Sequence, residues 1–95
     1  MYKVIFKVEK LLGKVKISYK ETLLATFWFS QGELASNFID AKILAGIFNC
    51  YNRENVEHFF LLKQTTKASF EVCTLMNSYQ IKKLEQLTKI IKMGL

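Results

Sequence analysis

Residues 2–9 and 14–20 alternate between apolar and polar side chains, and this period of two constrains the fold more than any other feature. In residues 2–9 the apolar side chains that share one face are Val4, Phe6 and Val8. In residues 14–20 they are Val15, Ile17 and Tyr19. Successive side chains of a strand point to opposite faces, so both segments are predicted to be half-buried β-strands with a basic outer face.

Turn residues separate these strands and lead into a third. Gly13 closes the segment 10–13 and can take the positive φ of a tight turn, and a second tight turn is expected at Lys20–Glu21. Residues 22–29 are apolar on both faces, which is typical of a central or doubly covered strand. If the helices cover Leu23, Ala25, Phe27 and Phe29, then Trp28 lies on the outer face near the lysines.

Residues 30–52 carry the longest helical signal. Ser30 and Glu33 have the spacing of a capping box, and the polar residues 52–55 predict that the helix ends near Tyr51. After Lys42 the apolar stripe moves to the formerly polar side, where it comprises Ile43, Leu44, Ile47, Phe48 and Tyr51. Three explanations are open: the C-terminal helix covers this half, a partner binds it, or the helix bends near Asp40. We expect Phe48 to be buried and Leu44 and Tyr51 to be exposed.

The remaining residues predict a second hairpin and a second helix. Residues 56–64 and 67–75 have the composition of strands, and Asn77 with Gln80 forms a capping box that opens a helix over residues 78–93. Gly94 is its expected C-terminal stop. The predicted order βββ-α-ββ-α describes a single α+β domain over residues 1–95, with an antiparallel-rich sheet of about five strands and two helices packed on one face.

Composition and motifs limit the class of protein. No apolar run has the length of a membrane span and no signal-peptide core is present, so we expect a cytoplasmic chain without a membrane partner. Cys50 and Cys73 lack the spacing of metal ligands and are expected to be reduced and buried. His58 is the only histidine and is expected in an apolar strand, hydrogen-bonded to a neighbour. Because no catalytic or phosphate-binding motif occurs, we expect a non-enzymatic protein with no metal and no other cofactor.

The net charge of +6 suits nucleic acid or an acidic protein surface as the partner. Outer-face lysines would contact phosphates and a tryptophan among them would stack on a base, which makes the candidate residues Lys3, Lys7, Lys14, Lys16, Lys20 and Trp28. Only Arg53 among the fourteen basic residues is an arginine, although arginine suits bidentate phosphate recognition best. The lysines also fit a solvated sheet face, or the codon bias of an A+T-rich genome. The C-terminal helix carries a second basic strip, namely Lys82, Lys83, Lys89 and Lys92.

The rotated apolar stripe suggests a function of another class. Aromatic anchors flanked by aliphatic side chains suit the core of a protein interface, so the candidate partner-binding residues are Ile43, Leu44, Ile47 and Tyr51. This hypothesis includes a homodimer and a small inhibitor of the kind that mobile elements encode. The competing interpretation is that these side chains pack in the core.

Residues 44–52 read LAGIFNCYN and resemble the LAGLIDADG motif of homing endonucleases, whose helix also precedes strands. The resemblance covers residues 43–94. Tyr51 stands where the family has its metal-binding acid, and Asn49 and Asn52 replace another acid and the final glycine. Three predicted strands precede the motif helix, which in the family begins the unit. The resemblance therefore implies a catalytically inactive relative of a homing-endonuclease half-domain.

Overall fold

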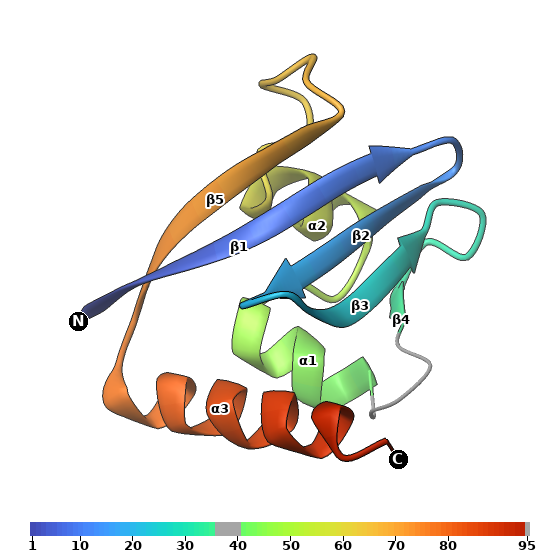
Figure 1. The fold of residues 1–95 in the computed structure, drawn as a ribbon. Coiled ribbons are helices and arrows are strands. Elements are labelled where there is room, and N and C mark those ends of the chain that lie inside the picture. The colour runs from blue at the N-terminus through green and yellow to red at the C-terminus, as the bar shows by residue number, and fades with distance from the viewer. Residues whose placement is uncertain (36–40, 95) are drawn as a thin grey trace.

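The computed structural model describes residues 1–35 and 41–94, which form an α+β structure built on one antiparallel sheet (Figure 1). The strands lie in the order β4-β3-β2-β1-β5, with bounds β1 Tyr2–Leu11, β2 Lys14–Tyr19, β3 Thr22–Trp28, β4 Leu34–Ala35 and β5 Ser69–Met76. Four of these strands are long, and the two-residue β4 only extends one edge. The helices are α1 Ala41–Phe48, α2 Arg53–Phe59 and α3 Ser78–Lys92. The α+β class and the antiparallel sheet are confirmed, whereas the described residues form three helices instead of the predicted two.

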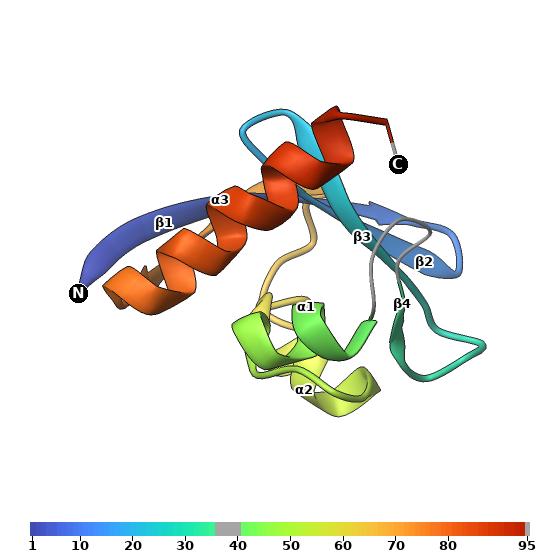
Figure 2. The ribbon, with the colours of Figure 1, turned by 90° about the horizontal axis from the view of Figure 1, so that it is seen from below.

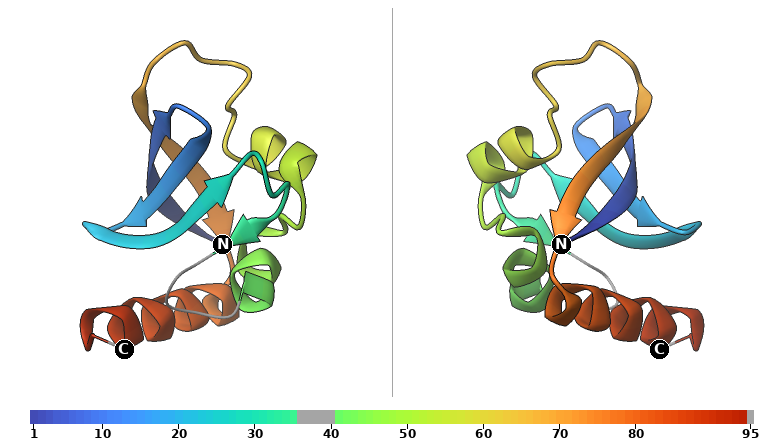
Figure 3. Two further views of the ribbon diagram at one scale, coloured as in Figure 1. Left: turned by 90° about the vertical axis from the view of Figure 1, so that its right-hand side faces the viewer. Right: turned by 90° about the vertical axis from the view of Figure 1, so that its left-hand side faces the viewer.

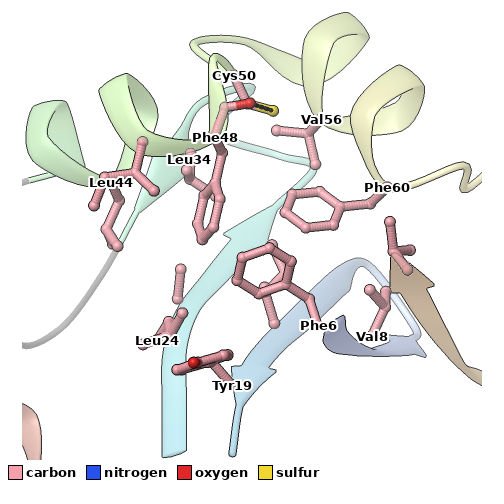
Figure 4. Packing of buried hydrophobic residues seen from close by; sticks show 14 of the residues in the cluster. Phe6, Val8, Tyr19, Leu24, Leu34, Leu44, Phe48, Cys50, Val56 and Phe60 are labelled. Atoms are coloured by element: carbon pink, nitrogen blue, oxygen red, sulfur yellow. Dashed lines mark hydrogen bonds between the residues drawn. The ribbon is translucent and has the colours of Figure 1, made fainter. Parts of the chain in front are cut away.

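Helices α1 and α2 lie against one face of the sheet, and α3 runs across the end of the sheet where β1 begins and β5 ends, as Figures 2 and 3 show from two further directions. Side chains from all three helices enter the same core. The inward side chains of β1 and β2 are buried as predicted: Val4, Phe6, Val8, Val15, Ile17 and Tyr19. Phe6 lies at the centre of the core, where its ring centroid is 5.0 Å from that of Phe48 and 6.2 Å from that of Phe60 (Figure 4). In residues 1–35 and 41–94, no helix lies over the opposite face of the sheet, which faces the viewer in Figure 1.

The helix predicted over residues 30–52 is wrong in its first part. The Trp28 carbonyl accepts hydrogen bonds from the N–H groups of Gln31 and Gly32 at 3.0 and 3.2 Å, and Gly32 has a φ of +71°. This turn sends the chain back along β3, so that Leu34 of β4 pairs with Phe27. The spacing of Ser30 and Glu33 therefore does not cap a helix. Residues 36–40, with the bend expected near Asp40, lie outside the described part.

A helix replaces the strand predicted over residues 56–64. The Asn52 side chain accepts a hydrogen bond from the Asn55 N–H at 2.9 Å, so the polar cluster that predicts a helix end instead caps the start of α2. Val56 and Phe60 lie one helical turn apart and are both fully buried. The predicted second hairpin is thus absent, and β5 pairs with β1 instead.

A β-bulge shifts the faces of β3. Ile17 pairs with Ala25 and Ser18 pairs with Leu23, which leaves Leu24 as an extra residue. Leu24 and Ala25 are both buried. Leu23 lies opposite Ser18 on the outer face, so its predicted inward position is wrong. Beyond the bulge, Trp28 pairs with Lys14 of the outer face, as predicted.

The C-terminal helix matches its prediction closely. Asn77 and Gln80 form the reciprocal capping box, with hydrogen bonds of 2.8 and 3.0 Å. Gly94 follows α3 with a φ of +77°, as a helix stop requires. No helix in residues 1–35 and 41–94 combines the length and the apolar character of a membrane span.

Candidate nucleic-acid interface

Four of the predicted lysines share the sheet face that the helices leave uncovered, which we call the bare face. Strand pairing places Lys16 of β2 opposite Glu9 of β1, and Lys14 opposite Leu11. With the two outward lysines of β1, they form a diagonal line that we call the Lys band: Lys3, Lys7, Lys16 and Lys14. The band covers eight residue steps along the strands, or about 27 Å. Alternation along β1 and β2 is sufficient to produce it.

Trp28 stands at the end of the Lys band. The Lys14 Nζ lies 4.6 Å from the centroid of the Trp28 ring, a separation typical of a cation–π contact. The tryptophan is only partly buried, so part of the ring is open to solvent. The bare face thus presents an aromatic surface beside an ammonium group.

Lys20 does not belong to the Lys band, contrary to the sequence prediction. It occupies the β2–β3 turn with a φ of +47°, and its Nζ lies 3.5 Å from a carboxylate oxygen of Glu85 on α3. A hydrogen bond with Tyr19 and the negative charges around it, including that of Glu85, raise the pKa of Lys20 above its ordinary value. The strand alternation stops at the turn, and Lys20 therefore lies beside α3 and not on the bare face.

Two carboxylates interrupt the Lys band. Glu9 pairs with Lys16, and Glu71 of β5 pairs with Lys7. Four lysines and two glutamates leave this part of the bare face with a net charge of +2. The side chains are cross-strand neighbours, yet the ion pairs found within 4.0 Å in the described residues involve none of the four lysines. Alternation in β1 already places Glu9 on the outer face. Nothing in the sequence reveals that Glu71 lies beside Lys7, because this depends on the β1–β5 register.

The apolar patch predicted to bind a partner is not an exposed surface. Leu44 is 0% exposed and Ile47 is 7% exposed, because both pack in the single core with the sheet and α3. The exposure expected for Leu44 is therefore wrong, while the predicted burial of Phe48 and exposure of Tyr51 are confirmed. The side chain of Ile43 lies outside the described part of the structure.

The other reactive side chains that the structure describes do not converge on a site. Burial raises the pKa of the Cys50 thiol to about 12, whereas Cys73 is exposed on β5, contrary to prediction. Cys73 pairs with Ile5 and so lies on the bare face. His58 is exposed on α2 and not part of a strand. Hydrogen bonds from Arg53 and Lys63 lower the pKa of Glu57, but this cluster is a surface ion-pair network. Within residues 1–35 and 41–94, no three His, Cys, Asp or Glu side chains are grouped so that they could hold a metal ion.

The chain matches no protein-family model, and neither a curated protein nor a solved structure shows significant similarity to it. The structure also departs from the order that the homing-endonuclease resemblance implies. In that order a hairpin follows the motif helix, whereas here α1 ends at Phe48 and is followed by α2. Asn49 has a φ of +55°, so the chain leaves the helix within the motif. The described residues therefore do not have the order of elements that the resemblance implies.

Proposed function

We propose that this protein binds the backbone of single-stranded nucleic acid along the Lys band, with Trp28 as a stacking surface for one base. The observation that supports this proposal most is the bare face itself, on which four lysines and the only tryptophan of the chain lie together. An uncovered sheet with an aromatic ring and cationic side chains suits a flexible strand, because the bases can stack while the phosphates follow the charges.

The charge pattern indicates weak, sequence-independent binding. Lysines act as point charges toward phosphate and do not read base edges as arginine forks do. Glu9 and Glu71 lower the local potential further. If each lysine of the band neutralises one phosphate, the logarithm of the binding constant should fall with the logarithm of the salt concentration at a slope of about −3.

Trp28 supplies the measurement, because it is the only tryptophan in the chain. Titration with an oligothymidylate should quench its fluorescence at low salt and lose this effect as salt is raised. Replacing Lys3, Lys7, Lys14 and Lys16 by glutamine should abolish the quenching and the retention on single-stranded DNA. The same replacement should leave the melting temperature nearly unchanged, since exposed charges contribute little to folding.

The C-terminal helix provides a matched control. Replacing Lys82, Lys83, Lys89 and Lys92 by glutamine removes the same number of charges from α3, which lies across the end of the sheet and is not part of the bare face. We expect this variant to bind as the wild type does. If it loses binding while the Lys-band variant retains it, α3 is the binding surface and the proposal is wrong.

A further inference from the structure

The outer side of β5 is the longest unpaired strand edge in the described residues. β5 pairs with β1 over its full length, from Tyr2↔Met76 to Glu9↔Ser69. No strand of the described part lies on its other side, because β5 ends the sheet order. The right-hand view in Figure 3 looks onto this edge, and β5 stands in front with no helix across it.

The β1–β5 register identifies the backbone groups that point to this edge. The Lys10 N–H donates to the Ala68 carbonyl at 2.7 Å, one step beyond the pair Glu9↔Ser69. Hydrogen-bonded and non-bonded pairs alternate along an antiparallel ladder. The even-numbered residues of β5 are therefore bonded to β1, and the N–H and C=O groups that point outward belong to Ser69, Glu71, Cys73 and Leu75.

This edge lacks the features that normally prevent pairing. Protected edges carry lysines, prolines or bulges, or are covered by another element. The sequence of β5 is SFEVCTLM, which contains no lysine and no proline, and its register with β1 runs without a bulge. Glu71 is the only charge on β5, and Lys7 lies beside it on β1. Leu75, at 56% exposed, adds apolar surface to the edge.

We infer that β5 is a self-association edge, which pairs antiparallel with β5 of a second copy about a twofold axis at Val72. In this register Ser69 faces Leu75 of the second copy and Glu71 faces Cys73 of the second copy. All four outward residues of each chain are then paired, which gives eight backbone hydrogen bonds, four donated by each copy. An axis at Glu71 would oppose two carboxylates, and an axis at Cys73 would leave Ser69 unpaired.

The side chains also favour a second copy over another extended peptide. Phe70 is only partly buried at the margin of the core, and in this register it faces Thr74 of the second copy, while Val72 faces Val72. These side chains lie on the core face of the sheet, so the apolar cores of the two copies meet where the two β5 strands pair. Residues with side chains on the bare face pair with residues whose side chains lie on the bare face of the second copy. The two bare faces therefore become one surface with two Lys bands. The inference does not depend on the proposed nucleic-acid function, because it rests on the β5 backbone alone.

Disulfide trapping tests the register. Directly opposed hydrogen-bonded residues have Cα atoms about 5.5 Å apart, within the range that a disulfide spans. Glu71→Cys should therefore cross-link through Cys73 of the second copy under mild oxidation and migrate as a dimer without reductant. If the twofold axis lay at Cys73 instead, Cys73 would face Cys73 of the second copy, and wild-type chains would cross-link best. If the axis lay at Glu71, residue 69 would face Cys73 of the second copy, and Ser69→Cys chains would cross-link best. Dimer formation by either of these as fast as by Glu71→Cys would overturn the inferred register.

Light scattering with reductant present tests the edge without a cross-link. Wild type should elute as a dimer, and Cys73→Pro should be monomeric, because proline removes an N–H that points to the free edge and not to β1. Cys73→Ala is the matched control and should stay dimeric, since it keeps that N–H. Circular dichroism establishes whether the proline variant is folded, and if it is not, the trapping experiment decides. A wild-type monomer at roughly millimolar concentration, or a folded Cys73→Pro dimer, would overturn the inference.

Discussion

Phe48 joins three parts of the core through one side chain. Its ring lies edge-on to Phe6 of β1, with centroids 5.0 Å apart, and it also contacts Phe59 and Phe60 at 5.9 and 5.4 Å. Such aromatic pairs add about 0.5–1.5 kcal/mol each beyond the burial of their area. Phe59 and Phe60, at the end of α2, thus cover the Phe48 ring of the rotated apolar stripe.

Truncation of this ring should therefore be costly. Phe48→Ala is expected to lower the free energy of unfolding by about 3–5 kcal/mol, as the loss of a fully buried phenylalanine does. Tyr51→Ala, three residues away and 58% exposed, is the control and should change it by less than about 0.5 kcal/mol. Urea unfolding of the two variants measures the difference. Phe48→Asp should not fold at all, and normal folding of that variant would show that the position is accessible to solvent.

At the scale of the element, the turn between β2 and β3 has an unusual composition. Both central residues have positive φ, +47° at Lys20 and +66° at Glu21, as a two-residue type I′ hairpin requires. Glycine or asparagine normally occupies such positions, because other side chains crowd the backbone there. The turn places the Lys20 Nζ 3.5 Å from Glu85 of α3, but both side chains are exposed and this ion pair offsets little of the conformational cost.

Relief of this crowding should stabilise the protein. Glu21→Gly is expected to raise the free energy of unfolding by about 1 kcal/mol, which corresponds to roughly 4–8 °C in melting temperature for a domain of this size. Gly13→Ala reverses the logic, because Gly13 has a φ of +75°, and it should lower stability by a similar amount. Thermal unfolding monitored by circular dichroism checks both. If Glu21→Gly lowered the free energy of unfolding, the Glu21 side chain would stabilise the protein by more than its positive φ destabilises it.

Elements with a strict period were predictable from sequence, and those between them were not. Alternation located β1 and β2 because that signal repeats over many residues, and the capping box located α3 because an apolar stripe that repeats along the helix follows it. The polar cluster at Asn52 fits either end of a helix, and only packing against Phe6 selects the helical period of Val56 and Phe60. In the candidate interface, the face of each lysine on β1 and β2 followed from alternation. The pairing of Glu71 with Lys7 did not, since no local pattern encodes which distant strand lies beside β1.

At the scale of the whole molecule, β1 pairs with one strand that is near in sequence and one that is far. Leu11 pairs with Lys14 across a short turn, whereas Glu9 pairs with Ser69, sixty residues later. The entropy of closing the longer loop is greater by about 2–3 kcal/mol, and no contact of β5 with β1 offsets it until the loop has closed.

The two flanks of β1 should therefore form at different times during folding. A pair of identical substitutions tests this: Val15→Ala in β2 and Val72→Ala in β5, at residues that are 1% and 3% exposed. Val15→Ala should mainly slow folding, and Val72→Ala should mainly speed unfolding, so that the φ-value is higher at Val15. Stopped-flow chevrons measure both, and equal φ-values would show that β1 gains its neighbours together. On the expected order, β1 is itself the open edge of the sheet in the transition state, and the later docking of β5 moves that edge outward.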